Sequence, residues 1–124
     1  MAKPTQIMNF NAGADISAYA IVKPGAANDK VVPAAAVTDK LMGVAQCIDV
    51  KLGYPVDVIQ RGIANVKAGG TITMGDPLTS NASGQAVKAA PAAGVNNRII
   101  GLAMTDAVSG DVFPALLSLG MIQG

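Results

Sequence analysis

Valine, isoleucine and leucine gather in four stretches of the chain, and apolar and polar positions change over short distances within them. Val56-Asp57-Val58 alternates with the period of two that is typical of a strand with one buried face. The chain has 14 Gly and 7 Pro, and all of its acidic residues are the turn-favouring Asp, so long helices are not expected. The pattern predicts a mainly β protein whose principal strands lie in residues 41–50, 54–66, 99–108 and 111–122.

A glycine separates the two strands of each predicted pair. Gly53 lies between the first two stretches and Gly110 between the last two, as expected for two hairpins with differently built turns. A shorter candidate strand precedes each hairpin, in residues 18–25 and 75–84, and a loop of small and polar residues follows it. Short strands at this spacing are typical of a β-sandwich or a small β-barrel.

The two hairpins belong to an internal repeat. Residues 30–45 recur 58 positions later as residues 88–103, with seven identities in sixteen positions. We expect two pseudo-symmetric repeat units, about residues 16–69 and 70–124, related by a pseudo-twofold axis. A unit of this size hardly buries its apolar face alone, whereas two units can close on each other. The sequence therefore predicts a single compact domain, a barrel or sandwich, built from both units.

Residues 1–15 fall outside this repeat, are largely polar and include the turn-favouring residues Pro4, Asn9, Asn11 and Gly13. They are expected to form an extended N-terminal arm rather than a domain. Ile7, Met8 and Phe10 are too apolar for a purely solvated tail. We therefore expect the arm to lie across a neighbouring subunit or a partner's surface and to bury these three side chains, by strand addition to an exposed edge.

Composition indicates that the core of a single copy is thin. Hydrophobic residues make up 51% of the chain, but aromatic residues only 3%, and much of the apolar content is alanine. Small side chains bury little area, and hydrophobic stabilisation follows area. Association with further copies is expected to supply additional burial.

The residue types available exclude most catalytic and ligand-binding chemistry. The chain has no His and no Glu, and its one cysteine, Cys47, is expected to be buried and inert. No catalytic residue, cofactor site or metal site is predicted, and the chain lacks phosphate-binding glycine loops. A net charge of +1 and few aromatic residues argue against nucleic-acid binding, and no apolar run is long enough to span a membrane.

Arg61 is the charged residue with the most informative position, because it lies within an apolar strand just before Gly62. One interpretation is an outward or edge-strand charge that discourages aggregation. The other is an interface arginine, since arginine is enriched where proteins associate. Together with Ile7, Met8 and Phe10, Arg61 is a candidate contact with a partner or another subunit.

Three stretches of the chain carry a resemblance to a known family. They are "VVPAAAVTDKLMGVAQ" (31–46), "VDVIQRGIANVKAGG" (56–70) and "AVKAAPAAGVNNRIIGLAMTDAVSGD" (86–111). These stretches are similar to the phage capsid decoration or cement proteins, a family of small β proteins that is sometimes described only as a domain of unknown function. The resemblance covers nearly the whole chain from about Tyr19. It implies no catalytic residues.

The resemblance implies a structural protein of the virion that is made in the host cytoplasm. Such proteins bind the outer surface of an assembled phage head and stabilise it, so the implied partners are the major capsid protein and further copies of the chain. A homotrimer is favoured over a homodimer. The alternatives are a small non-catalytic module that binds a ligand or carbohydrate, for which the four aromatic rings leave little platform, and, third, an enzyme without a recognised motif.

Overall fold

The computed structural model describes residues 3–37, 39–45 and 48–123, and these residues form strands, turns and bends without any helix. Among them there is accordingly no helix with the length and apolarity to cross a membrane. The predicted mainly β fold is confirmed. The strands are β1 (Lys3–Ala12), β2 (Ile21–Pro24), β3 (Lys30–Pro33), β4 (Gly43–Ala45), β5 (Pro55–Lys67), β6 (Pro77–Ser80), β7 (Ala86–Lys88), β8 (Asn96–Ala103) and β9 (Val112–Gln123).

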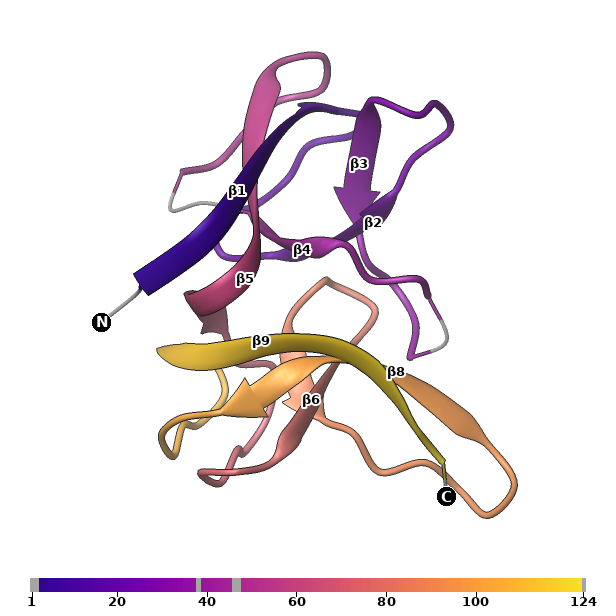
Figure 1. Cartoon of the computed structure of the whole chain (residues 1–124), viewed down its shortest axis with the longest axis vertical. Helices are drawn as coiled ribbons and strands as arrows, with labels where there is room; N and C mark the ends of the chain where they lie inside the picture. The colour runs from indigo at the N-terminus through magenta and orange to yellow at the C-terminus, as the bar shows by residue number, and fades with distance from the viewer. Residues whose placement is uncertain (1–2, 38, 46–47, 124) are drawn as a thin grey trace.

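The strands form one sheet that closes on itself over its first five members. The order is β1-β3-β2-β4-β5-β9-β8-β6-β7, and an additional pairing between β1 and β5 closes a five-stranded barrel. The other four strands continue the sheet from β5 and make up the second half of the molecule, which lies below the barrel in Figure 1. The predicted barrel is thus present, with extra strands attached to it.

β5 joins the two halves because it is long enough to pair in both. Residues 55–63 pair with β1, and two of them also with β4, whereas residues 62–67 pair antiparallel with β9, so Gly62 and Ile63 pair on both sides. Gly62 lies where the strand leaves the barrel for the second half, and its φ of 90° is a conformation that residues with a Cβ rarely adopt. The bend at Gly62 therefore sets how β9 is placed relative to the barrel.

The same pairings recur in both halves. Each half has a two-stranded pair followed by a long hairpin: β2–β3 with β4–β5, and β6–β7 with β8–β9. Each half also has an antiparallel bridge beside a carboxylate that accepts a backbone N–H. These are Ile16–Val50 with Asp49 accepting from Ala18 at 2.8 Å, and Ile72–Ala107 with Asp106 accepting from Met74 at 2.8 Å. Superposition of two units on a pseudo-twofold axis stays a prediction.

The N-terminal segment has a different place from the one expected. Residues 3–12 are extended, but they pair antiparallel with β5 of the same chain, from Lys3–Ile63 to Asn11–Pro55. The expectation that this segment finds no partner in its own barrel is wrong, because β5 offers it a complete edge. The repeat in the sequence does not include β1 because its side chains differ from those of residues 62–67, which make the corresponding pairings with β9.

Two groups of buried side chains fill the halves. One occupies the barrel and includes Ile16, Val22 and Val58, with Phe10 packed against it. The other fills the second half and continues between the halves through barrel residues such as Ile21, Val44 and Ile59. Because this second group draws on both halves, they form one packed body and not two separate domains.

Candidate contact surface

Arg61 lies on β5 immediately before the bend at Gly62, and its side chain is exposed. β5 and β9 pair as far as Gly62 and Leu117 and then diverge, so Arg61 faces a gap between the strands. Among the described residues, no carboxylate forms an ion pair with its guanidinium. An arginine that is exposed and has no acidic neighbour is free to meet a charge from outside the chain.

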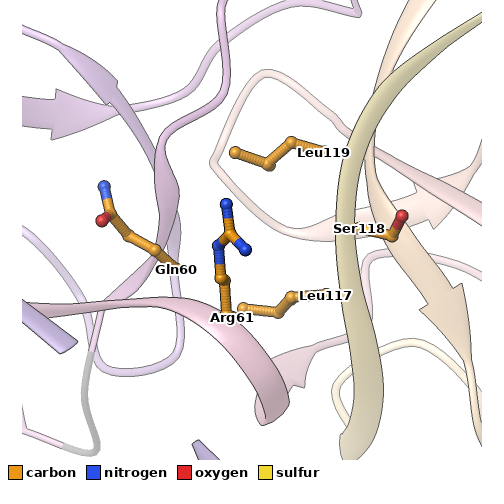
Figure 2. Close-up of a pocket in the computed structure, with 5 residues that line it drawn as sticks. All are labelled: Gln60, Arg61, Leu117, Ser118 and Leu119. Carbon is orange, nitrogen blue, oxygen red and sulfur yellow. The ribbon is translucent and has the colours of Figure 1, made fainter. Parts of the chain in front are cut away.

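The gap forms a hollow of about 360 Å³ lined by both strands. Figure 2 shows the guanidinium of Arg61 and the side chains of Leu117 and Leu119 directed into the space between β5 and β9. Gln60 and Ser118 also line the hollow, but their side chains lie on the far sides of their strands. The hollow therefore combines one cation with an apolar wall, of which Leu119 is 47% exposed.

A second hollow of about 270 Å³ continues along β9 on the other side of Leu119. Its lining includes Leu41 from the barrel half, Arg98 from β8 and Met121 from β9. Arg98 also joins the halves, because its backbone N–H donates to the carbonyl of Val37 at 2.7 Å. Neither hollow is lined by an aromatic side chain, so neither offers the ring platform on which sugar-binding sites usually depend.

The other three predicted contact residues lie on β1, the strand next to Arg61. Ile7 and Met8 are 44% and 45% exposed, whereas Phe10 is half-buried and packs against the barrel core. Gln6 of β1 pairs with Arg61, so the structure brings Ile7 and Met8 onto the strand beside the arginine. Phe10 belongs to the interior and is a structural residue here. Its apolar side chain gave the same sequence signal as those of Ile7 and Met8.

Sequence reasoning missed an exposed apolar row across the second half. Leu102 on β8 pairs with Leu116 on β9, which pairs in turn with Ile63 on β5. Leu102 is 40% exposed and Leu116 is 44% exposed, although both lie in the middle of the sheet. The detectable signal was Leu116-Leu117, two adjacent leucines in a strand whose side chains must point to opposite faces.

The described residues contain no group of three or more His, Cys, Asp or Glu that could hold a metal ion. Their ion pairs lie at the surface, and the shortest joins Lys23 and Asp39 at 3.1 Å. Backbone N–H donation from Ala35 lowers the pKa of Asp39, helped by Ala36 and Lys23 and opposed by partial burial. This carboxylate shapes a loop. Cys47 lies outside the described residues.

Comparison with known proteins gives a family match and a similar fold. The sequence model of a family described as phage cement protein matches residues 2–118. No curated protein matches the chain. Among solved structures, the N base of head fiber gp8.5 in bacteriophage phi29 is similar with a TM-score of 0.71 and 22% sequence identity, covering 96% of this chain and 98% of that chain. At this identity the likeness concerns the fold alone.

Proposed function

The chain belongs to the phage cement protein family, and from this we propose that it binds the outer surface of an assembled phage head and stabilises the head. The observation that carries the proposal is the family match over nearly the whole chain. Membership of the family makes the chain a structural protein of the phage head. Surface binding, the major capsid protein as partner, and synthesis in the host cytoplasm before assembly are the finer parts of the proposal.

The surface described above supports a role that depends on contact area. Exposed apolar side chains lie on β1, β8 and β9, and the exposed Arg61 lies between them in the sheet order. Aliphatic and arginine side chains without partners are suited to burial against another protein. We propose Ile7 and Met8 as contacts with the major capsid protein. We also propose that copies of the chain associate with one another on the head, as trimers in preference to dimers.

The test uses purified protein and heads assembled without it. We expect cryo-electron microscopy of the mixture to show added density at regular positions on the outer surface. Decorated heads should also release their DNA at a higher temperature than undecorated heads, because a ligand bound to the assembled state stabilises it. Heads without added density at saturating protein would contradict the proposal.

A pair of variants tests the contact residues. Ile7→Ser combined with Met8→Ser should weaken binding to heads by about tenfold or more, since two apolar contacts are lost. Val95→Ser is the matched control, because Val95 is 42% exposed but lies in the loop before β8. Deleting β1 is not a clean test, because β1 closes the barrel. Equal binding by the double variant and the control would exclude these residues.

A further inference from the structure

We propose that copies of this chain bind head to tail, with Arg61 of one copy entering an acidic hollow formed by Asp106 and Asp111 of the next. The inference rests on the self-association in the proposed function and assigns the two surfaces that carry it. Because the two surfaces lie at different places on the molecule, each copy offers one of each, and the contact propagates until a ring closes.

The acidic hollow lies beside the loop that joins β8 to β9. It has a volume of about 310 Å³ and is lined by Asp106, Asp111 and Val108, with Thr71 and Thr73 opposite. Asp106 accepts the Met74 N–H through Oδ1 at 2.8 Å, and Asp111 accepts the Val108 N–H through Oδ2 at 3.1 Å. These bonds fix both carboxylates and use one oxygen of each. Within the described part of the chain, neither carboxylate has an ion-pair partner.

The corresponding loop in the barrel half is arranged differently. Its bridge and its carboxylate, Asp49, match those of the second half. Lys51 of this loop pairs with Asp15 at 3.8 Å, whereas Val108 stands at the corresponding turn position of the other loop. Tyr54 and Asp111 likewise correspond, since each donates its N–H to the residue three places earlier. The loop between β8 and β9 therefore has one carboxylate more and one lysine fewer than the corresponding loop of the barrel half.

At Arg61 the halves differ in the opposite way, because here the barrel half carries a positive charge that the other half lacks. The corresponding place on β9, one residue before Gly120, holds Leu119 in the same hollow. The halves share a bonding scheme, but the barrel half adds a cation, Arg61, and the other half adds an anion, Asp111, and neither has an ion-pair partner among the described residues. Residues that break a shared local pattern without a structural reason are expected at functional sites. Opposite charges on two separate surfaces of one chain favour a second copy as the occupant of each.

The apolar residues around each charge also suit one another. Arg61 is accompanied by Leu117 and Leu119. Val108, which is 57% exposed, lines the acidic hollow, and Met74, which is 68% exposed, donates its backbone N–H to Asp106 at this hollow. An arginine between two carboxylates, surrounded by aliphatic side chains that exclude water, is the arrangement in which a charge pair contributes to association.

Charge reversal with sedimentation velocity and light scattering tests the contact. Arg61→Asp and Asp111→Lys should each weaken self-association by about tenfold or more, because like charges then face each other. The double variant Arg61→Asp/Asp111→Lys should recover part of the association lost in Arg61→Asp, since positions 61 and 111 regain opposite charges while Asp106 is unchanged. Lys51→Glu is the matched control, an exposed charge reversal on the other loop. Melting curves of all variants show whether each remains folded.

The outcomes separate this contact from the broader proposal. If the wild-type chain stays monomeric at about 100 μM, this contact is wrong, while decoration of heads and association of copies on the head remain open to their own test. If the chain assembles but neither single reversal weakens assembly, the copies associate through another surface. A double variant that associates no better than Arg61→Asp also overturns the contact.

Discussion

In the barrel half Phe10 on β1 faces Val56 on β5, and in the other half Val66 on β5 faces Phe113 on β9. The two cross-strand pairs have the same members in reversed positions. Similar exchanges occur elsewhere, since the barrel core has Val22 and Val31 where the other half has Leu78 and Ala86. Cores keep their packing when the total volume is conserved, so each half can vary its side chains while its backbone pairings stay the same.

The exposed loops of the two halves differ in a way that packing does not explain. In the barrel half, the loop of residues 48–54 carries Lys51, which pairs with Asp15. In the other half, the loop that lines the acidic hollow has the aliphatic Val108 between two carboxylates. A difference in the core is compensated nearby, whereas neither Asp106 nor Asp111 has an ion-pair partner among the described residues. The interior of each half therefore maintains the fold, and the halves differ in the charges of their exposed loops.

Removing the two aromatic rings gives the largest expected difference between the halves. Phe113 is 3% exposed and lies in the core that both halves share, whereas Phe10 is half-buried. Phe113→Ala should lower the free energy of unfolding by about 3–5 kcal/mol, and Phe10→Ala by about 1–2 kcal/mol. Urea unfolding followed by circular dichroism measures both. Leu119→Ala, at an exposed position, is the control, and equal losses at both rings would contradict the difference in burial.

Adding one methyl group at corresponding glycines tests whether the backbones agree. A Cβ at Gly43 would collide with the carbonyl oxygen of Ile59, and one at Gly101 with that of Leu116. Because backbone must move in both places, each change to Ala should cost about 1–3 kcal/mol or more of unfolding free energy. At Gly70 an added Cβ meets nothing nearer than 3.9 Å, so Gly70→Ala serves as the control. A large loss in one half alone would show that the halves are built differently there.

The two carboxylates beside the bridges should have equal and smaller effects. Asp49 and Asp106 each accept a backbone N–H at 2.8 Å. Replacing either with Asn weakens a charge-assisted bond, and each change should cost about 0.5–1.5 kcal/mol. Asp57 accepts the exposed Asn9 amide instead, so Asp57→Asn is the control with a smaller loss. Thermal melting of the three variants distinguishes a shared structural role from one confined to either half.

Sequence patterns located the long strands β5, β8 and β9 because Val, Ile and Leu alternate with turn residues over short distances. They did not predict β3 and β7, and β4 is shorter than the expected strand over residues 41–50. The place of β1 could not be predicted, because Ile7, Met8 and Phe10 give the same apolar signal whether they face a partner or their own barrel. Arg61 was recognised by its charge in an apolar strand, but Leu119 was not, since a leucine in a strand reads as core. Whether an aliphatic side chain on these strands is exposed depends on where β5 and β9 diverge. This divergence belongs to the tertiary structure and is not visible in the sequence of one strand.

Asp39 should make the stability of the barrel half depend on pH in a way the other half does not. It accepts the N–H groups of Ala35 and Ala36 and pairs with Lys23, and it shapes the loop whose Val37 carbonyl accepts the Arg98 N–H. At the aligned position of the sequence repeat stands Asn97, which has no charge to lose.

The sign of the effect follows from the lowered pKa of Asp39. A carboxyl group whose pKa is lower when folded contributes stability above its ordinary pKa of 3.8, and that stability is lost as pH falls through the folded pKa. The difference in unfolding free energy between wild type and Asp39→Asn should therefore be constant from about pH 7 to about pH 5 and shrink below about pH 4. Urea unfolding at each pH measures this difference.

Lys23→Met should keep part of this pH dependence, because the bond from Ala35 is the largest cause of the shift. If Lys23→Met abolished the pH dependence entirely, the ion pair with Lys23, and not the hydrogen bond from Ala35, would be the main cause of the lowered pKa of Asp39. If the difference from Asp39→Asn did not change with pH, Asp39 would have no part in the acid sensitivity of the barrel.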